Sequence, residues 1–335
     1  MAKKILIVAP SWVGDAVLAQ PLFRRLHQRL PGLILDVLAP SWVAALFERM
    51  AEVNTVITSP FRHGELKLVQ LWQLGRSLAN RGYDQAIVLP NSWKSALVPF
   101  FAGISLRTGF TGEMRFGLLN DARPLDKKQF PLMVERFAVL GEQRGAKPQH
   151  PRAHPRLQVS ASRRENTLKI MGLDTQKSVA VFCPGAEYGP AKRWPAKYFA
   201  ELAQRLENYQ VWLIGSPKDQ PIGEEIRQLS GSIAINLCGK TGLAEAIDLL
   251  SCASLVVSND SGLMHIAAAL DKPMLALYGS SSPAFTPPLS NHAQVLKLDL
   301  PCSPCFQRVC PLGHFNCMMQ LTPDQVLAKI GLKKL

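Results

Sequence analysis

Residues 4–15, which read KILIVAPSWVGD, decide the fold class of this chain. The apolar run over residues 4–9 predicts a strand buried on both faces, as the strands of parallel sheets are. The turn over residues 10–14 leads into a predicted amphipathic helix that ends near Arg29. Its apolar positions are Leu18, Leu22 and Leu26. A buried strand followed directly by a helix begins a βαβ unit, so this segment predicts an α/β fold with a parallel sheet.

The same alternation of strands and helices continues along the chain. In the first half we expect strands at residues 33–38, 53–57 and 85–89, and helices starting at Ser41 and spanning 66–80. In the second half the predicted strands are 179–183, 210–214, 255–258 and 274–278, and the predicted helices are 195–206, 224–229, 243–250 and 263–270. Between the halves, residues 147–164 are rich in proline, histidine and arginine, which is typical of a linker.

This pattern predicts two Rossmann-like domains with parallel sheets. We expect the first over residues 1–165 and the second over residues 166–321. A last segment, residues 322–335, begins a helix with Thr322 as N-cap and Pro323 at its first position. Two α/β domains joined by a linker usually bind their ligand between them.

The chain is strongly basic. It has 38 lysines and arginines against 25 aspartates and glutamates, a formal net charge of +13 at pH 7. Such an excess favours an anionic partner. Aromatic residues make up only 7% and no nucleic-acid-binding motif is present, so a phosphorylated substrate or a membrane surface is favoured over nucleic acid. No apolar run is long enough to cross a bilayer or to form a signal peptide, which predicts a cytoplasmic protein.

Three turns between a strand and a helix carry polar residues, and such turns are where open α/β sheets bind ligands. The first places Asp15 in the first turn of the first helix, where its carboxylate is either functional or only favourable to the helix dipole. The second, residues 184–195, combines glycines that let the backbone approach a ligand with Lys192 and Arg193, which could bind phosphate. The alternative for this segment is an ordinary surface loop.

The third turn, residues 259–265, follows an apolar strand and precedes a helix rich in alanine. Ser261 and Gly262 would present backbone N–H groups at the helix N-terminus, which suits an anion. His265 lies one turn further along the same face. A single histidine there is more often structural, but polar groups that converge on a helix start favour a functional site.

Four of the seven cysteines cluster near the C-terminus with His314 among them: Cys302, Cys305, Cys310 and Cys317. The first pair has a metal-like spacing, whereas the later spacing is irregular. Three interpretations of this cluster stay open. It holds a structural Zn²⁺ or another thiolate-bound metal, it consists of reduced thiols in a loop, or it forms disulfides.

These segments carry a resemblance to a known family. Residues 11–15, 184–195 and 259–265 are similar to signatures of the bacterial ADP-heptose:lipopolysaccharide heptosyltransferases. Two longer stretches, residues 89–103 (LPNSWKSALVPFFAG) and 108–121 (TGFTGEMRFGLLND), resemble the members that add the second heptose of the inner core. The likeness runs nearly end to end.

The resemblance implies a GT-B glycosyltransferase fold, with two Rossmann-like domains facing across a cleft and a C-terminal helix that packs back toward the N-terminal domain. It implies ADP-L-glycero-D-manno-heptose as the donor, held mainly by the C-terminal domain. The implied acceptor is heptosyl-Kdo2-lipid A, met by the N-terminal domain. The implied reaction is inverting transfer to the first heptose of that acceptor, at the cytoplasmic face of the inner membrane of a Gram-negative bacterium.

The functional positions of the family carry over residue by residue. Asp15 matches the proposed general base, which takes the proton from the attacking acceptor hydroxyl. Lys192 matches the lysine that contacts the leaving phosphate. The other donor-site positions are Gly185, Glu187, Asp260, Ser261, Gly262 and His265. No D-x-D motif lies near the donor loops, so a divalent ion is not expected to be required, although Mg²⁺ could stimulate the reaction.

Acceptor contacts are expected in the two longer stretches. The candidates for binding Kdo carboxylates or lipid A phosphates are Asn91, Ser92, Lys94, Arg107 and Arg115. The alternative for them is a solvated basic face. Other functions also stay open: a sister enzyme that adds the first or third heptose, a GT-B nucleotide-sugar epimerase, or a basic nucleic-acid binder.

Overall fold

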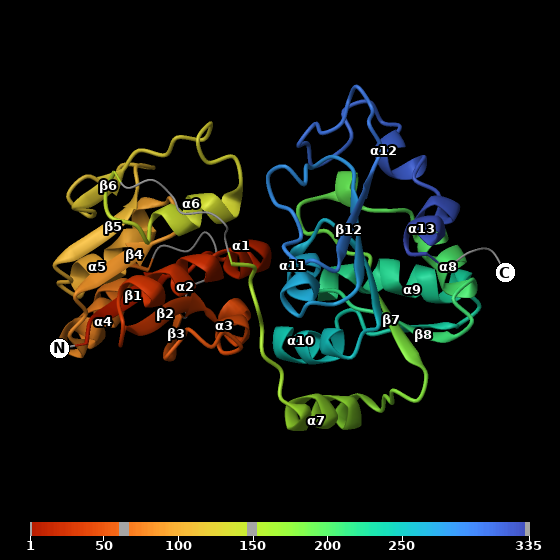
Figure 1. The fold of residues 1–335 in the computed structure, drawn as a ribbon, viewed down its shortest axis with the longest axis horizontal. Coiled ribbons are helices and arrows are strands. Elements are labelled where there is room, and N and C mark those ends of the chain that lie inside the picture. The colour runs from red at the N-terminus through yellow and green to blue at the C-terminus, as the bar shows by residue number, and fades with distance from the viewer. Residues whose placement is uncertain (1, 60–66, 146–152, 332–335) are drawn as a thin grey trace. The chain divides into compact units, whose positions relative to one another are not determined.

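The structure is a computed structural model, drawn as a ribbon in Figure 1. It describes residues 2–59, 67–145 and 153–331. Residues 147–152 of the predicted linker and residues 332–335 of the predicted C-terminal segment lie outside this part of the chain.

The chain divides into two compact units, Met1–Pro155 and Arg156–Leu335. The predicted boundary between residues 165 and 166 falls inside a helix of the second unit, α7 (Ala161–Met171). The division therefore comes before this helix.

The first unit is built on a parallel sheet of six strands in the order β3-β2-β1-β4-β5-β6. The strands are β1 (Lys4–Val8), β2 (Ile34–Pro40), β3 (Thr55–Ser59), β4 (Gln85–Val88), β5 (Leu106–Phe110) and β6 (Asp121–Arg123). The helices are α1 (Val13–Leu18), α2 (Gln20–Arg29), α3 (Ser41–Phe47), α4 (Leu68–Leu78), α5 (Leu97–Phe101) and α6 (Met133–Val139), with 3-10 turns η1 (Ala79–Arg81) and η2 (Trp93–Ala96). This is the Rossmann strand order.

The single helix predicted after β1 is two helices. Pro21 has no N–H to donate to the carbonyl of Val17, so the helical ladder is interrupted there. Ala19 lies at the break, where its N–H still donates to the Asp15 carbonyl at 3.0 Å. As a result α1 has only 6 residues, with Asp15 in its first turn.

The second unit repeats the plan with a parallel sheet in the order β12-β11-β10-β7-β8-β9. The strands are β7 (Ser178–Cys183), β8 (Tyr209–Leu213), β9 (Ala234–Asn236), β10 (Leu255–Asn259), β11 (Met274–Tyr278) and β12 (Ala293–Lys297). Besides α7, the helices are α8 (Ala196–Gln204), α9 (Gln220–Leu229), α10 (Leu243–Ser251), α11 (Gly262–Ala269), α12 (Asn316–Met319) and α13 (Pro323–Lys329), with 3-10 turns η3 (Pro190–Lys192) and η4 (Pro217–Asp219). Both units are thus α/β with parallel sheets, which confirms the predicted fold class.

The last described helix, α13, packs within the second unit. Thr322 is its N-cap, as predicted, and its side chain accepts from the N–H of Gln325. Val326 and Leu327 belong to the buried core that surrounds Trp194. The expectation that this segment packs toward the N-terminal domain stays a prediction.

The helices of the described residues are short. The longest, α4 and α7, have 11 residues each. Within residues 2–59, 67–145 and 153–331, none combines the length and the apolar character that crossing a bilayer requires.

Candidate active site

Each sheet reverses its strand order once, between β1 and β4 in the first unit and between β7 and β10 in the second. Ligands of open α/β sheets bind beyond the carboxyl ends of the strands at such a point. The segments that follow β1 and β4 carry Asp15 and Asn91, and those that follow β7 and β10 carry Lys192 and Asp260. The topology therefore places these predicted residues where each unit would bind a ligand.

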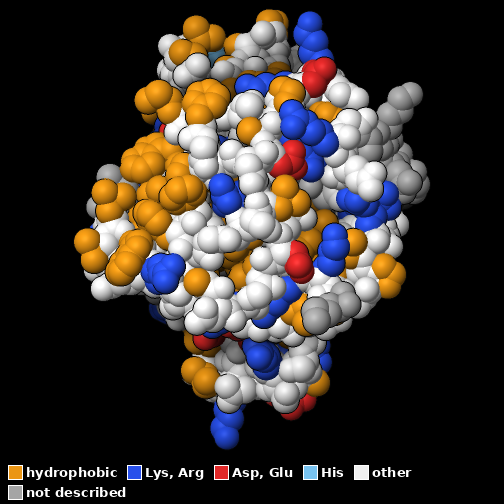
Figure 2. All heavy atoms as spheres, turned by 90° about the vertical axis from the view of Figure 1, so that its left-hand side faces the viewer, with side chains coloured by type: hydrophobic (Ala, Val, Ile, Leu, Met, Phe, Trp, Pro, Cys, Tyr) orange, Lys and Arg blue, Asp and Glu red, His pale blue; other side chains and the backbone are white. Residues whose placement is uncertain are grey.

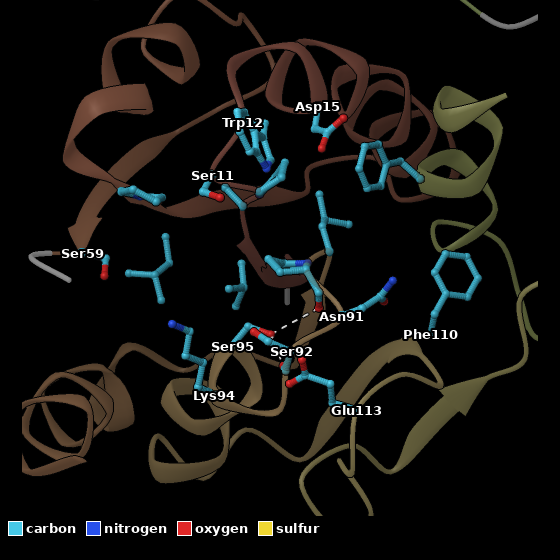
Figure 3. A pocket seen from close by; sticks show the side chains of 18 of the residues that line it. Ser11, Trp12, Asp15, Ser59, Asn91, Ser92, Lys94, Ser95, Phe110 and Glu113 are labelled. Atoms are coloured by element: carbon cyan, nitrogen blue, oxygen red, sulfur yellow. Dashed lines mark hydrogen bonds between the residues drawn. The ribbon is translucent and has the colours of Figure 1, made fainter. Parts of the chain in front are cut away.

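A pocket of about 860 Å³ lies at this point of the first unit, and we call it the α1 pocket. Figure 3 shows Asp15 pointing into it from α1, while Asn91, Ser92 and Lys94 lie on the loop across from it. Pockets that take small molecules span roughly 300–1,000 Å³, so the volume suits a sugar-sized group. Its polar lining residues are Ser11, Asp15, Ser59, Asn91, Ser92, Lys94, Ser95, Glu113, Lys127 and Arg136.

Trp12, Trp42 and Trp93 line the α1 pocket. Trp42 donates from Nε1 to the carbonyl of Ser11 at 2.9 Å, which fixes the turn before α1. Trp12 is half exposed. Flat apolar rings beside a carboxylate and neutral hydroxyl and amide groups suit a polyhydroxylated ligand, which presents both C–H faces and hydroxyl edges.

Arg115 does not line the α1 pocket, although we expected it to contact a ligand there. Only 4% of this residue is exposed. Its guanidinium donates to the carbonyl of Pro90 at 2.7 Å, to Asn91 Oδ1 at 3.3 Å and to the carbonyl of Phe110. Burial lowers the pKa of this guanidinium, and Glu113 opposes that shift. Arg115 therefore joins the loops that follow β4 and β5, and it supports the pocket from behind.

We expect Arg115→Ala to lower the free energy of unfolding by about 3 kcal/mol, because charge-assisted hydrogen bonds are lost and backbone carbonyls are left unpaired. Urea unfolding followed by circular dichroism measures this loss. A variant that unfolds like the wild type but needs more acceptor to reach half-maximal rate would instead restore Arg115 as an acceptor ligand.

Arg107 is partly buried, and backbone carbonyls hold its guanidinium. It donates to the carbonyls of Ile104 and Leu118, at 2.6 Å each, and it does not line the α1 pocket. These contacts hold the loop that follows β5, and the role of Arg107 in acceptor binding stays a prediction.

Glu113, Lys127 and Arg136 also line the α1 pocket, although we did not expect them there from the sequence. Glu113 Oε2 accepts from the backbone N–H of Trp93 at 3.2 Å. Glu113 lies in residues 108–121, the stretch that resembles the heptosyltransferases. Its carboxylate was therefore a signal that the sequence contained. Arg136 lies on α6, which was not predicted, and no pattern in the sequence pointed to it.

In the second unit the loop 184–195 and the N-terminus of α11 come together, and we call this the α11 site. Asn259 joins them, because its Nδ2 donates to the carbonyl of Pro184 at 2.7 Å and its Oδ1 accepts from the Trp194 N–H at 3.1 Å. Asp260 is 5% exposed and accepts from Lys192 Nζ at 2.6 Å and from Ser281 Oγ at 2.5 Å. The Lys192 ammonium is thereby fixed at the start of α11.

The N-terminus of α11 is formed as the sequence predicts. Ser261 is the N-cap and its Oγ accepts from the Met264 N–H at 3.5 Å, while Gly262 is the first helical residue. Backbone N–H groups at a helix start and a nearby ammonium both favour an anion. The α11 site can therefore hold a phosphate group.

Two other predicted donor residues have contacts within the second unit. A Cβ at Gly185 would lie 2.3 Å from Asp219 Oδ2, so only glycine fits where the loop crosses that carboxylate. Glu187 forms an ion pair with Lys218 on the surface. Their predicted donor contacts stay predictions.

His265 is buried one turn into α11, next to Asp260 and Lys192. Desolvation lowers the pKa of its imidazole from the usual 6.5 to about 4, aided by Lys192 and opposed by Asp260. The side chain is therefore neutral at pH 7, and it adds no positive charge to the α11 site.

This shift predicts a loss of stability in acid. Between pH 6.5 and about 4 the unfolded chain binds a proton at His265 that the folded chain does not, so the free energy of unfolding falls as the pH is lowered through this window. We expect the effect to reach about 3 kcal/mol near pH 4. Urea unfolding of the wild type and His265→Gln at pH 7 and near pH 4 measures it; equal losses for the two proteins would contradict the assignment.

The cysteine-rich segment after β12 packs against the loop of the α11 site. Tyr188 Oη donates to the carbonyl of Phe306 at 2.7 Å, and the N–H of Ala191 donates to the carbonyl of Arg308 at 3.1 Å. The Arg308 guanidinium lies 5.3 Å from the centre of the Tyr188 ring. The sequence alone did not predict this contact, because it joins segments more than a hundred residues apart.

All seven cysteines are free. Cys302, Cys305, Cys310 and Cys317 line one small cavity of about 20 Å³ together with His314. Across residues 2–59, 67–145 and 153–331, however, no three His, Cys, Asp or Glu side chains are placed so that they could hold a metal ion. The metal alternative for this cluster stays a prediction.

Similarity to known proteins covers the whole chain. Residues 71–316 match the family model of glycosyltransferase family 9 (heptosyltransferase). The chain is 47% identical to lipopolysaccharide heptosyltransferase 2 of Escherichia coli (strain K12) over 340 residues, covering 98% of this chain and 97% of that protein. It is 48% identical to lipopolysaccharide heptosyltransferase 2 of Salmonella typhimurium over 339 residues, with the same coverage of each chain.

The fold agrees with this similarity. The solved structure of E. coli ADP-heptose LPS heptosyltransferase II matches with a TM-score of 0.87 and 45% identity, covering 98% of this chain and 97% of that one. The match confirms the predicted GT-B type of fold. With a matched family model and close relatives along its full length, this chain belongs to glycosyltransferase family 9, the heptosyltransferases.

Proposed function

We propose that this protein transfers L-glycero-D-manno-heptose from ADP-heptose to the first heptose of heptosyl-Kdo2-lipid A, with inversion at the anomeric carbon. The observation that carries the proposal is the 47% identity to a lipopolysaccharide heptosyltransferase 2 over 98% of the chain. The α1 pocket and the α11 site supply the two kinds of chemistry that such a transfer needs.

In this mechanism the acceptor sugar binds in the α1 pocket. The Asp15 carboxylate takes the proton from the acceptor hydroxyl while its oxygen attacks the anomeric carbon of the donor. The bond from that carbon to the phosphate oxygen breaks, and ADP leaves with the electron pair. The Lys192 ammonium and the N–H groups at the start of α11 stabilise the negative charge that develops there.

The acceptor also carries anionic groups, namely Kdo carboxylates and lipid A phosphates. Asn91, Ser92 and Lys94, which we expect to contact the acceptor, line the α1 pocket, and Lys127 and Arg136 add positive charge around it. We assign the anion contacts to Lys94, Lys127 and Arg136, which line the pocket. Arg107 and Arg115 do not line it. We propose that the enzyme meets this lipid-anchored acceptor at the cytoplasmic face of the inner membrane.

We propose that the fixed charge of Lys192 lets transfer proceed without a required divalent ion, with Mg²⁺ stimulatory at most. Turnover that persists in EDTA supports this, and turnover that EDTA abolishes contradicts it. Bound Zn²⁺ or another metal at the cysteine cluster is tested separately, by metal analysis of anaerobically purified protein.

The decisive experiment measures ADP release from ADP-heptose with two acceptors in parallel, Kdo2-lipid A and heptosyl-Kdo2-lipid A. We expect turnover only with the heptosylated acceptor. Turnover only with Kdo2-lipid A would identify a sister enzyme that adds the first heptose. A sugar product without a new glycosidic bond would identify an epimerase.

A further inference from the structure

Two of the most exposed apolar side chains of the first unit flank a buried arginine. Met114 and Phe116, in the loop between β5 and β6, are 86% and 90% exposed. Arg115 between them is fixed by its hydrogen bonds to Pro90 and Asn91. The loop is therefore anchored at its centre, and it holds the two apolar side chains out into solvent.

This loop belongs to the same layer of the first unit as α4 and α5. Leu71 of α4, Leu97 of α5 and Leu119 of the loop are members of one buried hydrophobic cluster. The two helices approach closely because Gly75 lacks a side chain: a Cβ there would lie 2.5 Å from the Cβ of Phe101. The loop and both helices thus cover the sheet together, and their outward sides form one face.

The outward sides of α4 and α5 are apolar as well. Val69 and Trp72 of α4 are 68% and 50% exposed, and Phe100 of α5 is 42% exposed. Figure 2 shows hydrophobic side chains gathered on this end of the first unit, with lysine and arginine side chains beside them. We call this surface the outer apolar face, and its residues are Leu68, Val69, Trp72, Phe100, Met114 and Phe116.

Two arginines border the outer apolar face, and one exposed carboxylate, Glu113, precedes Met114. Arg76 is exposed and follows Trp72 by one helical turn, so it lies on the same side of α4. The Arg107 guanidinium lies 5.5 Å from the centre of the Phe100 ring, and its Nη2 donates to the carbonyl of Gly117 at 3.4 Å. Apolar side chains bordered by arginine match a layer of anionic headgroups above acyl chains.

The same segments also form part of the α1 pocket. Leu71 of α4 lines that pocket, as does Glu113, the residue immediately before Met114. A partner bound at the outer apolar face would therefore lie beside the pocket in which we propose that the acceptor sugar binds.

We propose that the outer apolar face docks on an anionic phospholipid bilayer, with Met114 and Phe116 inserted among the lipids. The inference rests on the proposed function, because the acyl chains of the acceptor hold it in a membrane. Contiguous exposed apolar side chains rimmed by polar residues mark interaction surfaces. Tryptophan, here Trp72, is enriched at the boundary between membrane and water.

The test is co-sedimentation of the full-length protein with vesicles of phosphatidylethanolamine and phosphatidylglycerol. We expect Met114→Ser/Phe116→Ser to lower the affinity for these vesicles by at least about a hundredfold, because two large apolar side chains no longer leave water. The matched control is Ile170→Ser, which removes an exposed apolar side chain from α7 of the second unit and should bind like the wild type. Because Met114 and Phe116 are almost fully exposed, their replacement should leave the urea midpoint unchanged.

Three results would overturn the proposal. They are wild-type binding by the double variant, no binding of the wild type to these vesicles, or a dimer that the double variant converts to a monomer without lipid. The last would assign the face to a second copy of this chain.

Turnover separates this proposal from the proposed function. On a heptosylated acceptor without acyl chains the double variant should match the wild type, and on the acceptor embedded in vesicles it should be slower. If the protein binds vesicles through this face but transfers heptose to neither acceptor, the proposed function fails and the docking face stands.

Discussion

Asp15→Asn is expected to lower kcat by a factor on the order of 10³, within the range that a general base contributes, and to leave the affinity for ADP-heptose unchanged. The amide keeps the size of the carboxylate in the α1 pocket but cannot take up the proton of the acceptor hydroxyl. The proposed donor contacts lie in the α11 site of the other unit, so donor binding should not depend on residue 15. ADP release at saturating acceptor measures the first effect, and calorimetric titration with ADP-heptose measures the second.

The matched control addresses the other interpretation of Asp15, that its carboxylate only favours the helix dipole. Glu245 occupies the same place in α10, the first turn. Glu245→Gln and Asp15→Asn should therefore lose similar stability, about 0.3–1 kcal/mol, while only the second loses turnover. Turnover by Asp15→Asn within about tenfold of the wild type would remove Asp15 from the mechanism, because even a modest general base contributes more than that.

The fold class was predictable because the central strands of parallel sheets are buried on both faces and their sequences are nearly unbroken apolar runs. β1, β7 and β10 have this form, and each was predicted within about two residues. β5 lacks such an apolar run, because Arg107 and Thr108 stand within it. The Arg107 guanidinium donates to the carbonyls of Ile104, Gly117 and Leu118, and periodicity along one strand carries no information about such contacts.

The helix α7 was missed for a different reason. The residues before it are rich in proline and arginine, which favoured a linker, and its apolar positions show no clear helical spacing. Local signals were nevertheless present. Ser160 is its N-cap, accepting from the Arg163 N–H at 3.3 Å, and Gly172 ends it with a φ of 63°. Capping residues thus marked the helix where hydrophobic periodicity did not.

Some residues of the candidate site could be located from the sequence, and others could not. Asp15, Asn91 and Asp260 lie in the segments that follow β1, β4 and β10, so the rule that ligands bind at the carboxyl ends of strands locates them from sequence alone. Arg115 stands in an equally polar loop, but its acceptors at Pro90 and Phe110 belong to two other segments. Whether such an arginine meets a ligand or backbone carbonyls is decided by tertiary structure.

Lys192→Ala is expected to weaken ADP-heptose binding at least about tenfold, the loss that follows removal of one charge-assisted hydrogen bond to phosphate. The rate should fall as well, because the same ammonium stabilises the departing ADP. Calorimetric titration with ADP-heptose and steady-state ADP release measure these effects. Lys197→Ala is the control, since it removes an exposed lysine of α8 five positions along the chain.

The structure adds a complication that a second variant resolves. Lys192 neutralises Asp260, which is 5% exposed, and removing one partner of a buried ion pair costs about 3 kcal/mol or more. Weak donor binding by Lys192→Ala could then come from the uncompensated carboxylate, which would repel the diphosphate. Asp260→Asn in the Lys192→Ala background removes that charge. If Lys192 contacts the donor phosphate, the double variant regains stability but still binds ADP-heptose weakly; recovery of wild-type affinity would mean that Lys192 serves only to neutralise Asp260.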